Sequence, residues 1–110
     1  TSAGEQLRDF CYVDDTVHAI LQALKVPEAK GEIFNVASGE PVSIRKMIEK
    51  VHELISLGKP QYGEIPYRPG ENMALYANIS KAKKILQWEP SISLEVGLEK
   101  TTDYFVKKLV

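Results

Sequence analysis

Six residues, EIFNVA (residues 32–37), indicate the fold class of this 110-residue chain. The run is apolar without alternating polar positions, and Gly31 and the Ser38-Gly39 pair flank it with turn residues. A strand that is covered on both faces has this pattern, and such strands usually belong to parallel sheets. The run therefore predicts a buried strand in an α/β protein.

An alternating segment near the start predicts another strand. Residues 7–13 have a period of two, so that Arg8, Phe10 and Tyr12 share one face of the expected strand. An arginine flanked by aromatic side chains on one strand face is a candidate binding surface.

The strand is expected to lead into an amphipathic helix. Asp14 and Asp15 would cap a helix from residue 16 to about residue 25, and Pro27 prevents its continuation. Apolar residues at helical spacing predict a buried stripe on this helix: Val17, Ile20, Leu21 and Leu24.

Three more helices are expected in the second half. Ser43 is a good N-cap for the most regular of them, whose apolar positions repeat at i, i+3, i+4 and i+7 before Gly58 and Pro60 end it. Residues 61–77 read as a loop with two short strands. Asn78 or Ser80 opens a third helix and Ser93 precedes the last. The order predicts one α/β unit over residues 1–110, with about four helices and two or three short strands.

Composition excludes several classes of function. A net charge of -1 and no cluster of basic residues argue against nucleic-acid binding. Cys11 is the only cysteine, which excludes an internal disulfide and predicts a reducing, cytoplasmic location. No run approaches the roughly 18 apolar residues of a membrane span, and no signal-peptide pattern is present.

No catalytic or metal-binding motif stands out. The seven glycines form neither a dinucleotide fingerprint nor a phosphate loop. His18 and His52 lie alone on expected helices, so we assign them solvated or core roles and predict no metal. Tyr104 and Lys108 match Y-x-x-x-K, in which a lysine one turn away lowers the pKa of a catalytic tyrosine. Their helix has the pattern of a solvated face, so we interpret this pair as structural.

Three segments carry a family resemblance: GEQLRDFCYVDD (4–15), YRPGEN (67–72) and NISKAKKILQWEPSISLEVGLEKT (78–101). In this order they resemble the C-terminal third of the extended short-chain dehydrogenase/reductases. More narrowly, they resemble the NAD-dependent sugar-nucleotide epimerases and dehydratases, which include the UDP-glucose 4-epimerases. The resemblance implies that Arg8 and Arg68 bind the diphosphate of a nucleotide sugar and that Glu71 accepts hydrogen bonds from its ribose.

The resemblance also implies what this chain does not supply. In the family, NAD takes a hydride from C4 of the hexose, and the glycine-rich NAD fingerprint and catalytic Ser/Thr, Tyr and Lys precede the R-D-F strand. We therefore expect a sugar-nucleotide-binding portion without the NAD-binding part, inactive alone and beginning in mid-enzyme. The family usually has aspartate where Glu71 stands, so the reach to a ribose would be one methylene longer.

The residue chemistry agrees with these roles. Guanidinium forks bind phosphate oxygens in pairs, a carboxylate accepts hydrogen bonds from a vicinal diol, and Phe10 and Tyr12 are placed to cover a sugar or base. The competing interpretation makes Arg8 with Asp9, and Arg68 with Glu71, surface ion pairs of little energetic value.

The expected partner is the NAD-binding part of the same enzyme or a second copy of the chain. In the family, the helix after Asp15 and the EIFNVA strand pack against the NAD-binding part, so we expect an exposed apolar patch in its absence. Two alternatives remain: a free-standing, non-catalytic binding module derived from this family, and a helical interaction module that uses the stripe of residues 44–57.

Overall fold

The computed structural model describes residues 1–109, which form four α-helices and three short strands. In chain order the elements are β1 (Leu7–Asp9), α1 (Val13–Lys25), the 3-10 turn η1 (Pro27–Ala29), β2 (Pro41–Ser43), α2 (Ile44–Ile55), β3 (Ala74–Leu75), α3 (Ser80–Leu86) and α4 (Leu94–Leu109). This content confirms the predicted α/β class and the predicted number of helices and strands.

The three strands form one small mixed sheet in the order β2-β1-β3. β1 pairs antiparallel with β2 and parallel with β3, so that Arg8 lies opposite Val42 on one side and Leu75 on the other. The strand predicted at residues 32–37 is wrong, because this run pairs with none of the three strands within residues 1–109. Phe34, Val36 and Ala37 instead pack against the core near α3.

The first strand is shorter and the first helix longer than predicted. β1 ends at Asp9, and α1 begins at Val13 with Tyr12 as its N-cap residue. The alternation from Arg8 to Tyr12 therefore does not continue on one strand face. The acids at positions 14 and 15 lie inside the first helical turn rather than capping it, because the carboxylate of Asp15 binds another segment, as described below.

The predictions for the later helices are confirmed. The Ser43 hydroxyl accepts a hydrogen bond from the backbone N–H of Lys46 at 3.1 Å and caps α2, as expected. α2 ends earlier than the glycine suggested, because Ser56 already adopts a left-handed conformation with a φ of 57°. The Ser93 hydroxyl caps α4 by accepting from the N–H of Val96 at 3.2 Å.

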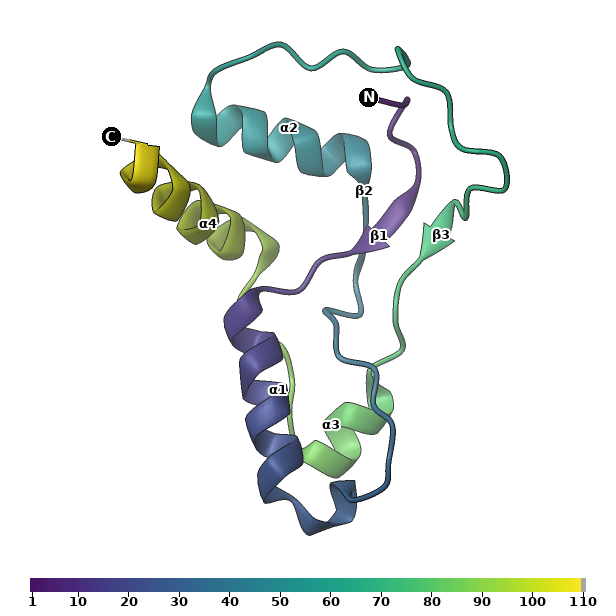
Figure 1. The fold of residues 1–110 in the computed structure, drawn as a ribbon, viewed down its shortest axis with the longest axis vertical. Helices are drawn as coiled ribbons and strands as arrows, with labels where there is room; N and C mark the ends of the chain where they lie inside the picture. The colour runs from purple at the N-terminus through teal and green to yellow at the C-terminus, as the bar shows by residue number, and fades with distance from the viewer. Residues whose placement is uncertain (110) are drawn as a thin grey trace.

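The elements form a flat slab. Figure 1 shows α2, α4 and the sheet in one half and α1, α3 and η1 in the other. The chain measures 49 × 40 × 17 Å, and its radius of gyration of 16.5 Å exceeds the about 13 Å of a compact domain of this size.

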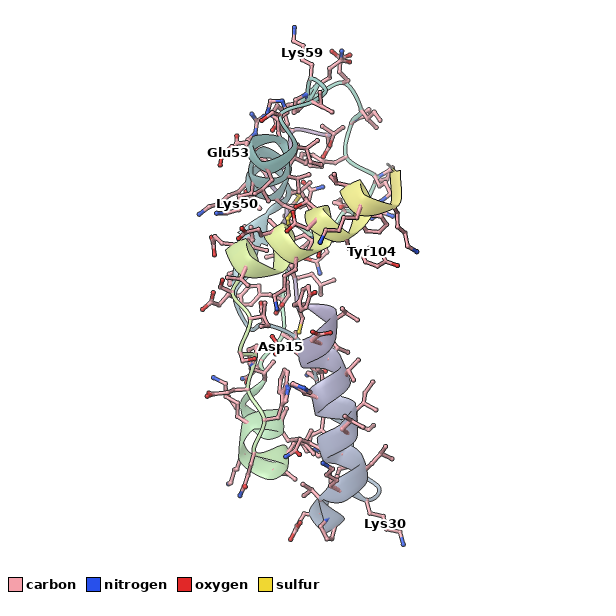
Figure 2. All side chains as sticks on the ribbon, turned by 90° about the vertical axis from the view of Figure 1, so that its left-hand side faces the viewer. Asp15, Lys30, Lys50, Glu53, Lys59 and Tyr104 are labelled. Carbon is pink, nitrogen blue, oxygen red and sulfur yellow. The ribbon has the colours of Figure 1, made fainter. Side chains whose placement is uncertain are left out.

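The apolar stripe on α1 is exposed, which corrects the buried stripe predicted for this helix. Leu24 is 79% exposed, and Val13, Val17, Ile20 and Leu21 are exposed with it. The side chains on the outer side of α1 point away from α3, with no other element beside them (Figure 2). The exposed apolar surface expected on this helix is therefore present, whereas most of the apolar side chains of residues 32–37, expected to share it, pack against the core.

The buried face of α1 carries small and polar residues instead. Asp15 and Ala19 are buried on it, and the Gln22 side chain donates to the backbone oxygen of Leu86 at 3.0 Å. These positions are spaced i, i+4 and i+7 on the side of the helix opposite the apolar stripe. They pack on a core around α3: Ile79, Ala82, Leu86 and Trp88.

Asp15 connects α1 to the segment between α3 and α4, and its position is labelled in Figure 2. Only 1% exposed, its carboxylate accepts from the N–H and hydroxyl of Ser91 at 3.1 and 3.0 Å and from the N–H of Ile92 at 3.0 Å. Its backbone oxygen accepts from the indole N–H of Trp88 at 3.0 Å. Asp15 thus joins α1 to the connection between α3 and α4 through both its side chain and its backbone.

We predict that Asp15→Ala destabilises the chain strongly while Asp14→Ala does not. The first change leaves the backbone N–H groups of Ser91 and Ile92, whose hydrogen bonds are partly buried, without an acceptor, at a cost of about 2 kcal/mol. Asp14 occupies the same helical turn but is exposed, so its loss should cost less than about 1 kcal/mol. Urea denaturation of both variants checks the difference, and equal losses would contradict the assigned role of Asp15.

Candidate functional site

Two arginines from distant parts of the chain meet on one carboxylate. Arg8 donates through Nη2 to Oε1 of Glu71 at 2.9 Å, and Arg68 donates through Nε to Oε2 of the same residue at 3.0 Å. The side chains of Glu71 and Arg8 are 10% and 22% exposed, whereas Arg68 is 84% exposed. We call these three residues the arginine clamp.

A tight turn sets the distance between Arg68 and Glu71. The N–H of Glu71 donates to the backbone oxygen of Arg68 at 3.0 Å, with Pro69 and Gly70 between them. Gly70 has a φ of +73°, and proline followed by a glycine of positive φ is the signature of a type II turn. The RPGE sequence therefore brings both side chains to one place without a helix or strand.

The loop that carries this turn is fastened to the start of the chain. The N–H of Ile65 donates to the backbone oxygen of Thr1 at 3.0 Å, and the N–H of Glu5 donates to the Tyr67 hydroxyl at 3.0 Å. Beyond the turn, the loop enters β3 beside β1. These contacts place Glu71 next to Arg8.

Arg8 itself is held by its strand. Its Nη1 donates to its neighbour, the Leu7 carbonyl, at 2.7 Å, which leaves Nη2 directed to Glu71. Nothing in the sequence indicates this role of the Leu7 carbonyl, because no residue pattern marks a backbone acceptor.

The surface ion pair considered between Arg8 and Asp9 does not form, because Asp9 has other partners. Its carboxylate accepts from the N–H and hydroxyl of Ser38 at 2.7 and 2.6 Å, and from the N–H groups of Gly39 and Ala77 at 2.8 and 3.3 Å. The pair considered between Arg68 and Glu71 is present. It belongs to the clamp rather than standing alone.

Opposing effects act on the pKa of Asp9. Partial burial raises the pKa, but the hydrogen bonds from Ser38, Gly39 and Ala77 stabilise the charged form and together hold it below its ordinary value. The carboxylate of Asp15 behaves in the same way, since burial raises its pKa and the hydrogen bonds from Ile92 and Ser91 outweigh that effect. Both aspartates are therefore charged, and their carboxylates hold separate segments of the chain together by hydrogen bonds.

Phe10 and Tyr12 belong to a different surface from the clamp. Both line a cavity of about 320 Å³ bounded by residues 10–13, α2 and α4, and its lining includes none of the three clamp residues. Gly97 of α4 permits this arrangement, because a Cβ there would lie 3.1 Å from Cδ1 of Tyr12. The structure thus separates Phe10, a predicted substrate contact, from Arg8, Arg68 and Glu71.

The remaining candidates do not form a second site. Lys108 lies over the ring of Tyr104, 4.8 Å from its centroid, near the exposed end of α4. His52 bonds through Nε2 to the backbone oxygen of Gly58 at 3.0 Å. Among the described residues, no group of three or more His, Cys, Asp or Glu side chains could hold a metal ion.

None of the helices between residues 1 and 109 combines the length and hydropathy that a bilayer span requires.

Comparison with known proteins identifies the family of this chain. The model of the GDP-mannose 4,6 dehydratase family matches residues 2–101. The chain belongs to this family.

Individual relatives within the family are epimerases. A UDP-glucuronate 4-epimerase from Thermodesulfobacterium geofontis is 39% identical over 92% of this chain and 31% of that relative. The Thermotoga maritima UDP-glucose 4-epimerase, solved with UDP-glucose, matches with a TM-score of 0.87 and 36% identity over 97% of this chain and 34% of its own. A Bacillus cereus UDP-glucuronic acid 4-epimerase, solved with UDP-glucuronic acid and NAD, matches with a TM-score of 0.83 and 33% identity over 99% of this chain and 34% of its own.

The family member described here spans about a third of the length of these relatives. The resemblance deduced from the three segments is thereby confirmed, as is the association of the family with NAD, which the Bacillus cereus complex contains. The roles of the clamp residues are argued below.

We predict that the chain loses stability below about pH 4 and that Asp9→Asn removes part of this loss. The pKa of Asp9 is lower in the folded chain than its unfolded value of about 3.9. The unfolded chain then binds more protons, so the stabilisation is complete above that value and is lost as pH falls through the lower folded pKa. Urea midpoints of Asp9→Asn between pH 7 and pH 3 should fall less steeply than those of the unmodified chain, while the exposed control Asp14→Asn should follow the unmodified chain. If the urea midpoints of Asp9→Asn and of the unmodified chain fell in parallel as the pH is lowered, the stabilising role of the Asp9 carboxylate would be refuted.

Proposed function

We propose that this chain binds the nucleoside diphosphate of a nucleotide sugar within an NAD-dependent epimerase or dehydratase. The observation that carries the proposal is the meeting of Arg8 and Arg68, 60 positions apart in the sequence, on Glu71. Two guanidinium groups from separate segments are the arrangement that a diphosphate, with its two adjacent negative groups, requires.

The clamp has donors to offer a ligand. Within residues 1–109, Arg68 donates only through Nε, which leaves its two terminal amino groups for phosphate oxygens. The 84% exposure of its side chain makes these groups accessible. Arg8 is less exposed and would contact the diphosphate from the strand side.

The redox chemistry belongs to another part of the enzyme. The described residues contain no glycine-rich turn between a strand and a helix, so they do not fit NAD, and we assign no catalytic residue to this chain. When bound, NAD would accept the hydride from C4 of the hexose. This chain would hold the nucleotide end, so that binding energy orients the sugar for that transfer. A cytoplasmic location fits its single, unpaired cysteine.

The exposed stripe of α1 supports a partner that carries the NAD-binding part. Val13, Val17, Ile20, Leu21 and Leu24 form a contiguous apolar stripe on a chain that is only 17 Å thick. Ile33, in the segment that we expected to be a covered strand, is 84% exposed. We therefore propose that this surface packs against the NAD-binding part, which would occupy the remaining two-thirds of the relatives' length.

The first prediction of this proposal concerns binding. In the natural polypeptide that carries this chain, Arg8→Ala and Arg68→Ala should each weaken binding of UDP-glucose by at least about tenfold, because each removes a charge-assisted hydrogen bond to phosphate. Lys81→Ala on α3 is a matched control that removes one positive charge from the other half of the slab. Titration calorimetry with UDP-, dTDP-, GDP- and CDP-sugars measures the effect. The proposal would be refuted if the unmodified protein bound none of these sugar nucleotides, or if both arginine variants bound them with unchanged affinity.

The second prediction concerns the stripe. Ile20→Lys/Leu24→Lys should destabilise the natural polypeptide by at least about 2 kcal/mol, because two lysines would replace apolar side chains in a covered interface. The 110-residue chain alone should be nearly unaffected, since both side chains are exposed in it. Ala23→Lys, exposed on the same helix beside the stripe, is the control. Thermal unfolding compares the variants. If the natural polypeptide tolerated the double change, the alternative of a free-standing, non-catalytic module would be favoured.

A further inference from the structure

We propose that Tyr62 and Tyr67 are positioning residues for the arginine clamp, because they hold the loop that carries Arg68 in place. This inference rests on the proposed function and extends it to side chains outside the clamp. The loop comprises residues 57–73, between α2 and β3. The two tyrosines contact different parts of one surface, which is formed by residues 1–5 and the start of α2.

The loop depends on such contacts because it has little structure of its own. It contains no helix or strand, and most of its side chains are exposed, Leu57 at 76% and Ile65 at 60% among them. Figure 1 shows the loop as an irregular trace that passes beside the N-terminal segment. Ordering a segment of this kind costs conformational entropy, so a few specific contacts determine whether it stays in place. The position of Arg68 is therefore set by where the loop is attached.

Tyr62 stacks on an arginine that is itself fixed. The guanidinium carbon of Arg45 lies 3.9 Å from the centroid of the Tyr62 ring. Nε of Arg45 donates to the backbone oxygen of Ala3 at 3.0 Å, and its backbone N–H donates to that of Gly4 at 2.8 Å. Gly4 permits this approach, because a Cβ there would lie 2.8 Å from the backbone nitrogen of Arg45. The guanidinium is thus held in place for the ring, and the contact uses the ring of Tyr62 rather than its hydroxyl.

Tyr67 uses its hydroxyl instead. The hydroxyl accepts a hydrogen bond from the backbone N–H of Glu5 at 3.0 Å. Tyr67 directly precedes Arg68, so this bond fixes the backbone at the point where the turn of the clamp begins. Between the two tyrosines, the N–H of Ile65 donates to the backbone oxygen of Thr1 at 3.0 Å. The loop is therefore attached at three successive places, and the last of them adjoins Arg68.

The two contacts predict opposite results for the same substitution. Tyr62→Phe keeps the ring that stacks on Arg45, so the loop should stay attached. Tyr67→Phe removes the acceptor of the Glu5 N–H, so the loop should open more often. Tyrosines that only filled space would tolerate phenylalanine at both positions. Neither substitution changes the net charge, so electrostatic attraction of the ligand is not altered.

The test measures loop opening and ligand affinity in the natural polypeptide that carries this chain. Hydrogen exchange detected by mass spectrometry follows the amides of residues 61–73, and titration calorimetry measures binding of UDP-, dTDP-, GDP- and CDP-sugars. We expect Tyr62→Ala and Tyr67→Phe each to speed exchange in the loop and to weaken binding by about threefold, because the binding-competent position of the loop is then less populated. Tyr62→Phe should change neither quantity. Tyr104→Phe, which removes a hydroxyl from an exposed tyrosine on α4, is the matched control.

A second arm tests whether the tyrosines act through Arg68. In the Arg68→Ala background, Tyr67→Phe should weaken binding less than it does in the unmodified protein, because the guanidinium that it positions is absent. An undiminished effect of Tyr67→Phe in this background would overturn the positioning role.

The outcomes separate this inference from the proposed function. If the unmodified protein binds a sugar nucleotide, and Tyr62→Ala and Tyr67→Phe leave affinity and exchange unchanged, the inference is overturned and the proposed function stands. Equal losses in Tyr62→Phe and Tyr62→Ala also overturn it, because the ring would not be the group that acts. A fall in global thermal stability without faster exchange in the loop overturns it as well. Failure of the unmodified protein to bind any of these ligands overturns the proposed function and this inference with it.

Discussion

The carboxylate of Asp9 determines how the half of the chain that contains the sheet is arranged. It accepts hydrogen bonds from Ser38, Gly39 and Ala77, and so gathers at the end of β1 the segments that lead into β2 and out of β3. The sheet has only three short strands, and its ladder bonds alone would give little stability. Because Asp9 follows Arg8 directly, the same contacts also fix the backbone from which Arg8 reaches Glu71.

Local patterns predicted the helices well and the strands poorly. The helix of residues 44–55, its serine cap and the start of α4 are encoded in short stretches of sequence, and the structure confirms them. Strands need partners elsewhere in the chain. The run at residues 32–37 has the composition of a buried strand, yet none of the strands within residues 1–109 pairs with it. β2 was not predicted, because three residues carry too little periodicity to be recognised.

The site was predicted in part for a similar reason. The residue types at Arg8, Arg68 and Glu71 indicated phosphate chemistry, and the structure brings these three together. Their arrangement around a shared carboxylate is a tertiary contact that spacing does not reveal. The grouping of Phe10 and Tyr12 with Arg8 assumed a strand that continued to residue 13, and the chain instead turns into α1 after Asp9. The roles of Asp9 and Asp15 were likewise not visible in the sequence, because their partners lie 29 to 77 residues away.

Three residues, Phe10 to Tyr12, separate the strand that carries Arg8 from the helix whose apolar side faces solvent. A short connector of this kind transmits restraint, because fixing one end limits the conformations available to the other. Packing a partner on α1 would therefore restrict the backbone of Arg8 before any nucleotide arrives. If the chain has the proposed function, part of the entropy cost of ordering the clamp would be met when the partner packs on α1, and a nucleotide would bind more tightly to the assembled protein than to the chain alone.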